Sequence, residues 1–399
     1  QLKDAVESLP VGAHPSQLNN IITPLITHPK KELLRALTQL EPQEQWLVQP
    51  KEPQMKNLWG PAVKWNVQPG SFTHLTEFFG PVLGVMKAQD LKQACTLANQ
   101  TEYGLTAGLQ SLDDDEIQFF LENMKAGNLY VNNKTTGAIV GRQPFGGIKN
   151  SRRGAGGKAG GINYILQFTK FKDKGEPIQI SELSSSPIGS LINFWEKIEW
   201  HNENAEYSNE IQRALKGATS CQHQYTNYFS KAQKLSETQQ VIGQENIFRY
   251  RKVGKYTIRV HQEDSISDML LRLIAGVIAG NNVSVSLPYS MCETKISRSL
   301  ESHYLQLIRK SFSISFESDQ ELGNKILGNY MDRLAYTHSE RVPTEIFKAA
   351  ISVNLPIIHH KPVLEGRFLM LEQFNEQCIS HTYHRYGNSG LKQFEGRNL

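Results

Sequence analysis

The sequence predicts an α/β fold built from two consecutive α/β units. Helical and strand patterns alternate over residues 1–172, as is typical of α/β architecture. The composition then shifts to Ser, Pro and Gly over residues 173–190, which is the usual sign of a domain boundary. A second strand–helix–strand order follows between Tyr256 and Pro288. We therefore divide the chain into a first unit (1–172), a linker (173–190), a second unit (191–375) and a C-terminal tail (376–399).

The predicted elements follow in chain order. The chain opens in a helix, and the apolar spacing of Leu91–Ala98 predicts another helix, with Cys95 on its buried face. Strands are expected at Gly127–Asn132 and Tyr164–Thr169. In the second unit Glu245–Arg251 leads into a further set of elements. These are a strand at Tyr256–Val260, a helix at Ile266–Ala279 and a strand that ends near Pro288.

Composition excludes several classes of protein. The chain has 399 residues, 39% hydrophobic and 21% charged, as expected of a globular protein with two to three cores. No apolar run approaches the ~20 residues of a membrane span, and no signal peptide is visible. The net charge of +4 is small and dispersed, so we expect no nucleic-acid partner, and Arg152-Arg153 is expected in a solvated loop.

The four cysteines, Cys95, Cys221, Cys292 and Cys378, lie far apart and form no CxxC pair. This spacing predicts a reducing compartment, hence a cytoplasmic location, and neither a disulfide framework nor a zinc site. None has the sequence context of a nucleophile. Cys221 and Cys292 lie among polar residues, and Cys378 lies in the tail.

The segment Thr135–Gly147, TTGAIVGRQPFGG, follows the strand predicted at Gly127–Asn132. Its Gly137-Ala138 pair leaves two backbone N–H groups unobstructed, and successive amides of this kind suit a carboxylate. The alternative is a hairpin-like connection in which glycine takes strained positions and Phe145 lies in the core.

This unbroken segment resembles the substrate-anchoring loop of the L-glutamate γ-semialdehyde dehydrogenases, also called Δ1-pyrroline-5-carboxylate dehydrogenases, in the aldehyde dehydrogenase superfamily. The resemblance implies that Gly137 and Ala138 hold the α-carboxylate of the semialdehyde. It implies that Phe145 packs against the aliphatic middle of the substrate.

A second resemblance to the superfamily lies at Glu77–Val82, EFFGPV. It implies that the Glu77 carboxylate accepts hydrogen bonds from the nicotinamide ribose and that Phe79 lies against that end of an NAD cofactor. The alternative is a strand start with a surface glutamate. Asp90-Leu91, Ala98-Asn99 and Glu102–Leu109 recur in the family in the same order and spacing, which favours the first interpretation.

The Gly-rich run Gly154–Gly161 is not a phosphate loop, because Arg152 stands where that motif needs Gly, and Ala159 stands where it needs Ser or Thr. It does not fit a dinucleotide fingerprint, since polar and basic residues precede it. The run resembles the family segment that links the anchor loop to the closing strand, here Tyr164–Thr169. Arg152 replaces a common Gly there.

The reactive cysteine of the family precedes the segment equivalent to Gln1–Gly12. The resemblance therefore implies that the nucleophilic Cys and the general-base Glu lie upstream of this chain. We expect no catalytic residue here, a C-terminal fragment, and no activity of this chain alone.

The second unit resembles the start of an aldehyde dehydrogenase cofactor domain, a Rossmann-like α/β domain, in degenerate form. His261–Ser265 replaces the segment after the first strand, and Ser286-Leu287 stands where the family has a ribose-binding Lys. His338 replaces the Gly of a turn, which blocks close backbone approach. We predict that this unit binds no dinucleotide.

The end of the chain, Glu376–Asn388, resembles the terminal motif of long proline utilization A proteins. That resemblance implies a proline dehydrogenase domain with FAD upstream, packing against it, a homo-oligomer and a covering role for the last domain. His381 and His384 could face one way, but no third ligand accompanies them, so we expect no metal.

The function that these features favour is NAD-dependent oxidation of L-glutamate γ-semialdehyde to L-glutamate in proline catabolism. One rival is a non-catalytic scaffold, supported by residues 190–399. Another is an aldehyde dehydrogenase that acts on a different aldehyde.

Overall fold

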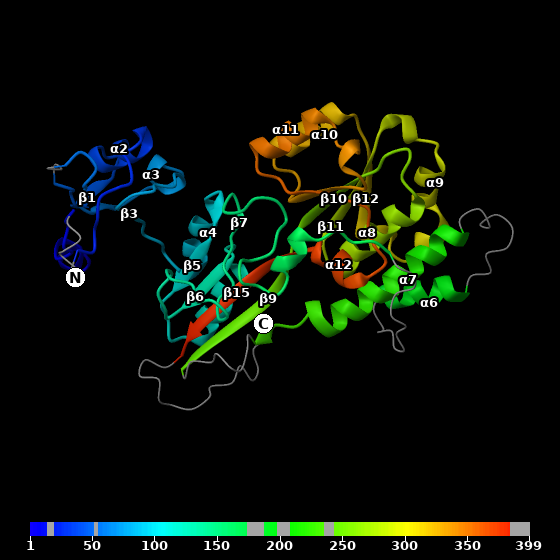
Figure 1. Cartoon of the computed structure of the whole chain (residues 1–399), viewed down its shortest axis with the longest axis horizontal. Helices are drawn as coiled ribbons and strands as arrows, with labels where there is room; N and C mark the ends of the chain where they lie inside the picture. Colours follow the sequence, from blue (N-terminus) through cyan, green and yellow to red (C-terminus); the bar gives the residue numbers. More distant parts are fainter. Residues whose placement is uncertain (14–19, 52–54, 174–186, 198–207, 235–242, 384–399) are drawn as a thin grey trace. The chain divides into compact units, whose positions relative to one another are not determined.

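The computed structural model describes residues 1–13, 20–51, 55–173, 187–197, 208–234 and 243–383 (Figure 1). The chain divides into two compact units. The first comprises Gln1–Gly104 with Leu112–Lys125, and the second comprises Leu105–Ser111 with Ala126–Leu399.

The first unit contains a small mixed sheet of order β1-β2-β3, in which β1 and β2 are antiparallel and β2 and β3 are parallel. Asp90 and Asp113 begin two helices by accepting backbone N–H groups of their first turns. Its elements are α1 (Leu2–Glu7), α2 (Lys31–Thr38), β1 (Gln45–Val48), β2 (Ala62–Trp65), α3 (Phe72–Leu75), β3 (Val82–Val85), α4 (Leu91–Gln100), β4 (Tyr103–Gly104) and α5 (Asp114–Asn123).

The second unit contains two five-stranded sheets. One has the order β5-β6-β15-β9-β8 and joins strands far apart in the sequence: β6 pairs in parallel with β5 and β15, and β15 pairs antiparallel with β9. Figure 1 shows β15, in red, between β6 and β9. Its strands are β5 (Thr106–Leu109), β6 (Asn128–Val131), β8 (Gln233–Lys234), β9 (Gln244–Lys252) and β15 (Phe374–Thr382).

The other sheet is entirely parallel and has the order β12-β11-β10-β13-β14. The strands are thus arranged third, second, first, fourth and fifth in chain order, which is the doubly wound Rossmann arrangement. They are β10 (Lys255–Arg259), β11 (Asn282–Leu287), β12 (Phe312–Phe316), β13 (Arg333–Tyr336) and β14 (Ile357–His359). The predicted α/β class with a Rossmann-like second part is confirmed.

Helices pack against these sheets around two clusters of buried apolar residues. The larger contains Trp195, Phe248 and Tyr304, and the smaller contains Leu322 and Ile346. The central helix α8 is buried along nearly its whole length because apolar residues cover most of its circumference. The helices are α6 (Pro187–Lys197), α7 (Ser208–Gln224), α8 (Ile266–Ile278), α9 (Lys295–Glu301), α10 (Asp319–Leu327), α11 (Thr344–Ser352) and α12 (Gly366–Leu371). The short elements are β7 (Ile148–Lys149), the π-helical η3 (Tyr225–Phe229), and the 3₁₀ turns η1 (Tyr164–Phe168), η5 (Tyr289–Met291), η6 (His303–Leu305), η7 (Arg309–Ser311) and η8 (Ser339–Arg341).

One sequence prediction about elements is wrong. The closing strand predicted at Tyr164–Thr169 is the 3₁₀ turn η1, because Tyr164 and Leu166 donate their N–H groups to carbonyls only three residues back. Glu245–Arg251 leads into the strand β10, as expected, and is itself part of the strand β9.

The segment predicted as a C-terminal tail begins inside a sheet. Phe374–Thr382 forms β15, an interior strand paired on both edges. The predicted linker and tail lie largely outside the described residues. The four-segment division of the sequence stays a prediction, since the compact units are divided elsewhere.

Arg152 was expected in a solvated loop and is instead partly buried. Its guanidinium donates to Asn375 Oδ1 at 2.7 Å. Burial, together with the positive charge of the neighbouring Arg333, lowers the pKa of Arg152 to about 9. The Arg in place of Gly thus fastens the Gly-rich run to β15.

Candidate functional site

The candidate substrate loop, Thr135–Gly147, begins where β6 ends. Asn132 marks that end: it adopts a positive φ of 53°, and its side chain exchanges two hydrogen bonds with the backbone of Ser111. The return of the loop passes so close to the start of β6 that a Cβ on Gly127 would lie 1.9 Å from the Gly146 carbonyl oxygen. Only glycine fits at residue 127, so the strand itself positions the loop.

Two backbone donors of the loop are unused. Among the residues that the structure describes, neither the Gly137 N–H nor the Ala138 N–H has a hydrogen-bond partner. Gly137 has a φ of +79°, is exposed, and a Cβ there would meet nothing within 4 Å. Consecutive amides that follow a left-handed residue and face open space can bind a small anion such as a carboxylate.

The loop keeps this shape because Gln143, only 5% exposed, braces it from within. The Gln143 side-chain oxygen accepts the Ile139 N–H at 3.1 Å. Its amide nitrogen donates to Ser380 Oγ at 3.0 Å and to Asn246 Oδ1 at 3.2 Å. Ser380 is in β15 and Asn246 is in β9, so the C-terminal strands hold the loop directly.

Phe145 and Lys158 fix the far side of the loop. Phe145 forms an isolated antiparallel bridge with Ala159, with N···O distances of 3.0 and 2.9 Å. The buried Lys158 ammonium donates to Asn128 Oδ1 at 2.8 Å and to the Gly146 carbonyl. Hydrogen bonds to the backbone of Phe145 and to the Gly146 carbonyl therefore fix the position of the Phe145 ring.

The surroundings of Lys158 are electrostatically unusual. Burial lowers the pKa of Lys158 to about 8, because the charged ammonium is removed from water. Burial also raises the pKa of Glu376 above its ordinary value, although its carboxylate accepts the Lys158 N–H at 2.8 Å and the Asn163 amide at 2.8 Å. These groups tie the Gly-rich run to β15.

The candidate cofactor residues, Glu77 and Phe79, belong to the first compact unit, whereas Gly137, Ala138 and Phe145 belong to the second. Glu77 is exposed, and the Phe79 side chain is 84% exposed. The neighbouring Phe78 instead packs against Phe72, with 5.4 Å between the ring centroids. A carboxylate and an aromatic face left in solvent fit the ribose end of a dinucleotide.

Three of the four cysteines do not have the surroundings of a nucleophile. Cys95, Cys221 and Cys378 are buried. Burial raises the pKa of all three thiols, that of Cys378 to about 12, which disfavours the reactive thiolate. Cys221 was expected among polar residues but lies in the apolar core. Cys292 is exposed, on the turn after β11.

The described residues contain no cluster of metal-binding side chains and no membrane-spanning helix. Within them no three His, Cys, Asp or Glu side chains gather as a metal site would require. His381 is 4% exposed with its ring against Tyr383, and His384 lies outside the described residues. None of the helices described is both long and apolar enough to cross a membrane.

Sequence reasoning missed the residues that hold the loop: Gln143, Lys158, Ser380 and Asn246. Gln143 carried no distinguishing signal, since it adjoins Arg142 and the same loop contains Thr135 and Thr136. Nothing in the sequence pairs it with Ser380, which lies 237 positions away.

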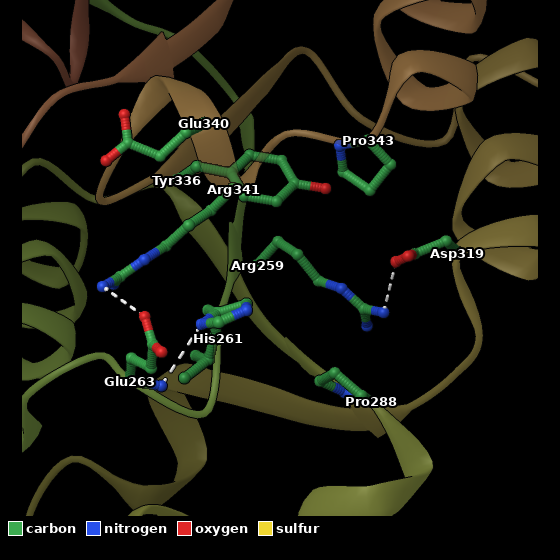
Figure 2. Close-up of a pocket in the computed structure, with 10 residues that line it drawn as sticks. Arg259, His261, Glu263, Pro288, Asp319, Tyr336, Glu340, Arg341 and Pro343 are labelled. Carbon is green, nitrogen blue, oxygen red and sulfur yellow. Dashed lines mark hydrogen bonds and ion pairs between the residues drawn. The ribbon is translucent and has the colours of Figure 1, made fainter.

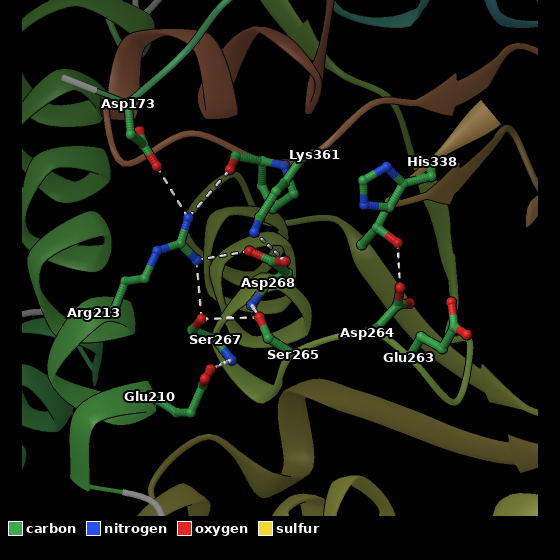
Figure 3. A network of polar contacts seen from close by, with 12 residues as sticks. Asp173, Glu210, Arg213, Glu263, Asp264, Ser265, Ser267, Asp268, His338 and Lys361 are labelled. Carbon is green, nitrogen blue, oxygen red and sulfur yellow. Dashed lines mark hydrogen bonds and ion pairs between the residues drawn. The ribbon is translucent and has the colours of Figure 1, made fainter. Parts of the chain in front are cut away.

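At the start of the first helix of the Rossmann-like sheet, side chains of the protein accept two backbone amides (Figure 3). The Ser267 N–H donates to Glu210 Oε2 at 2.8 Å, and the Asp268 N–H donates to Ser265 Oγ at 3.0 Å. Arg213 in turn pairs with Asp268 at 2.7 Å. A dinucleotide pyrophosphate would need this helix end, where side chains of the protein already accept the amides.

Comparisons with known proteins relate the first part of the chain to a known family. Residues 1–173 match the aldehyde dehydrogenase family model. Over 102 residues the chain is 45% identical to the 1-pyrroline-5-carboxylate dehydrogenases of Bacillus mycoides (strain KBAB4) and Bacillus thuringiensis (strain Al Hakam). Each alignment covers 26% of this chain and 19% of the relative.

Among solved structures, proline utilization A (PutA) from Corynebacterium freiburgense aligns with 97% of this chain at 30% identity and a TM-score of 0.74. The alignment covers 34% of that protein. The chain therefore spans about a third of this relative and about a fifth of the curated ones. Residues 1–173 are thus similar to the aldehyde dehydrogenase family, and the fold of nearly the whole chain is similar to that of part of this PutA protein.

Proposed function

We propose that this chain is the substrate-anchoring part of an NAD-dependent L-glutamate γ-semialdehyde dehydrogenase in proline catabolism. The observation that carries the proposal is the pair of N–H groups at Gly137 and Ala138, which have no partner among the residues that the structure describes. They lie on a segment that Gln143 braces and Lys158 fastens. The named relatives, which are 1-pyrroline-5-carboxylate dehydrogenases and a PutA, support the choice of substrate.

The loop selects its substrate by charge. The semialdehyde has a carboxylate at the end opposite its aldehyde, and the Gly137 and Ala138 amides bind that carboxylate with two charge-assisted hydrogen bonds. Phe145 packs against the methylene groups and excludes water. Holding the far end of the substrate fixes the position of the aldehyde carbon, which lowers the entropic part of the barrier.

Glu77 and Phe79 would hold the nicotinamide end of NAD. The exposed Glu77 carboxylate accepts hydrogen bonds from ribose hydroxyls, and the Phe79 ring covers an apolar face. When bound, NAD supplies the hydride acceptor of the oxidation. The acceptor is proposed as NAD; a choice between NAD and NADP does not follow from these two residues.

The nucleophilic Cys and the general-base Glu are proposed to lie outside this chain. The raised thiol pKa of Cys95, Cys221 and Cys378 disfavours each as the attacking group. We therefore predict that the 399-residue chain, assayed by itself with NAD and the semialdehyde, forms no NADH. NADH formation by it would contradict this assignment.

A scaffold role is favoured by one specific observation, and we propose it for the C-terminal part only. β9 and β15 contact the loop through Asn246 and Ser380. The carboxyl edge of the parallel sheet, in contrast, has its helix amides occupied by Ser265 and Glu210. The two candidate functions are compatible, since one region binds substrate and the other supports it.

Partners and location are also proposals. The PutA relative supports a multidomain or oligomeric arrangement. We extend this to packing against an upstream proline dehydrogenase domain with FAD, and to a homo-oligomer. Four free cysteines in the described residues support a reducing, cytoplasmic location.

Replacement of one backbone donor tests the proposal. In the polypeptide that joins this chain to the nucleophile, Ala138→Pro removes one N–H from the carboxylate site. We expect KM for L-glutamate γ-semialdehyde to rise about 100-fold, the loss of roughly 2–3 kcal/mol of charged hydrogen bonding. KM for butanal, which lacks the carboxylate, changes little.

The control is Ala138→Gly, which keeps the N–H group and preserves KM. Equal losses for both aldehydes in Ala138→Pro would show that the loop positions the chemistry without recognising a carboxylate, and the proposed substrate would be withdrawn.

A further inference from the structure

A pocket of about 440 Å³ lies at the carboxyl edge of the parallel sheet (Figure 2). His261 follows β10, Pro288 follows β11 and Tyr336 ends β13. β10 and β13 are neighbours, although β11 and β12 lie between them in the sequence. The chain therefore reverses its winding direction here, and open α/β sheets bind ligands at such switch points.

Tyr336 contributes a buried hydroxyl that nothing satisfies. The residue is 3% exposed and lines the pocket, and its hydroxyl has no hydrogen-bond partner in the part of the chain that the structure describes. Figure 2 shows this hydroxyl between Arg259 and Pro343. Burial raises the pKa of Tyr336, so the phenol keeps its proton. The hydroxyl can therefore donate a hydrogen bond to a ligand.

Arg259 and Asp319 form an ion pair beside that hydroxyl. Arg259, 4% exposed, donates to Asp319 Oδ1 at 2.7 Å, and its other terminal nitrogen donates to Ser286 Oγ and to the Glu317 carbonyl, both at 3.0 Å. The Arg259 Nε–H and the second Asp319 oxygen have no partner within the described residues. Each member of the pair thus keeps hydrogen-bonding capacity for a third group.

The charges of the lining exclude a strongly anionic ligand. Two guanidinium groups, from Arg259 and Arg341, face three carboxylates, from Glu263, Asp319 and Glu340. Arg341 is already paired with Glu263 at 3.3 Å. A pyrophosphate would meet these carboxylates, whereas a molecule with one positive and one negative group can satisfy both signs.

We propose that this pocket binds an α-amino acid of zero net charge. Its carboxylate accepts hydrogen bonds from the Tyr336 hydroxyl and the Arg259 guanidinium, and its ammonium donates to Asp319. The apolar rings of Pro288 and Pro343, which line the pocket, accommodate a short aliphatic side chain. This site is separate from the anchor loop, and the inference does not depend on the proposed dehydrogenase activity.

Calorimetric titration of the 399-residue chain tests the site directly. The probes are L-alanine, L-proline and L-leucine, with propionate, D-ribose and NAD for comparison. We expect at least one amino acid to bind, and Tyr336→Phe to weaken its Kd about tenfold. That variant removes only a hydroxyl that has no partner within the described residues, so its thermal unfolding stays at the wild-type temperature.

The matched control is Tyr330→Phe, which removes a hydroxyl from a side chain 68% exposed outside the pocket and leaves Kd unchanged. Asp319→Asn weakens amino-acid binding by removing the charge that faces the ammonium. The proposal is overturned if no amino acid binds, if Tyr336→Phe binds it as tightly as wild type, or if only ribose or NAD binds.

Discussion

The anchor loop and the carboxyl edge of the parallel sheet both follow buried parallel strands, yet they use their backbone donors in opposite ways. In the loop, the Gly137 and Ala138 amides are unpartnered among the described residues. At the sheet edge, Ser265 and Glu210 accept the first amides of α8. The comparison teaches that a position after a buried parallel strand does not by itself leave backbone amides available to a ligand.

The difference has a structural cause. The loop is held by a side chain, Gln143, whose own partners lie on other strands, so its backbone amides need not stabilise it. The start of α8 is held by hydrogen bonds that consume the amides a phosphate would need. One region keeps its donors for a ligand and the other uses them for stability.

Loss of an ion pair behind the sheet edge should have the largest effect. Arg272, fully buried in α8, donates to Glu372 at 3.0 Å and to the backbone carbonyls of Tyr336 and His360. Arg272→Met leaves the Glu372 carboxylate buried without this partner. We expect unfolding in urea to show a loss of about 3–5 kcal/mol.

Arg298→Met is the control, because Arg298 is exposed on α9 and its removal should cost less than about 0.5 kcal/mol. If Arg272→Met were as stable as this control, the sheet edge would not be built from internal polar contacts as described.

Removal of the brace should affect the loop next. Gln143→Ala frees the Ile139 N–H and the side chains of Ser380 and Asn246. We expect a loss of about 1–2 kcal/mol in stability and a KM for the semialdehyde about tenfold higher, at nearly constant kcat. Steady-state kinetics of the polypeptide with its nucleophile measures both.

Gln110→Ala is the matched variant, since Gln110 is exposed and makes one hydrogen bond, to the Asn133 carbonyl. A fall in kcat with unchanged KM in Gln143→Ala would mean that the brace acts on chemistry and not on anchoring.

The pH dependence of stability should report Lys158. Its pKa is lowered from 10.5 to about 8 by burial, so between these values the unfolded chain binds more protons than the folded one. Stability therefore rises with pH across this window, by at most about 3 kcal/mol. Lys158→Met abolishes that rise.

Exposed Lys134 supplies the control, because Lys134→Met should keep the wild-type pH profile. If the stability of wild type and of Lys158→Met changed in parallel from about pH 8 to pH 10.5, burial would not lower the pKa of the Lys158 ammonium.

The smallest effect is expected at Cys292, the exposed thiol. Cys292→Ser should change the unfolding free energy by less than about 0.5 kcal/mol, because the side chain is exposed and lines neither the anchor loop nor the pocket. NADH formation by the polypeptide that joins this chain to its nucleophile should stay unchanged. Loss of activity in this variant would require a thiol of this chain in the reaction.

Local patterns predicted much of this molecule. Strand β6, helix α4 and helix α8 were expected from their apolar patterns. The role of the Gly137-Ala138 pair came from the resemblance to a family loop, and it stays a prediction. The predicted strand at Tyr164–Thr169 failed because the apolar residues there, including Ile165 and Phe168, are exposed on a 3₁₀ turn.

Long-range contacts could not be predicted in this way. Ser380 reaches Gln143 only because β15 pairs with β6, and that pairing joins residues about 250 positions apart. Neither residue has a local pattern that specifies its partner. The same holds for Arg152, whose partner Asn375 lies on that strand.

The central claim is that the loop recognises the carboxylate of an aldehyde substrate. The most direct test is the rate of NADH formation by the polypeptide that joins this chain to its nucleophile. L-Glutamate γ-semialdehyde is compared with butanal, which has no carboxylate. The account predicts a kcat/KM at least about 100-fold higher for the semialdehyde, as two charged hydrogen bonds supply. Equal values for the two aldehydes, or no NADH from well-folded protein, would contradict it.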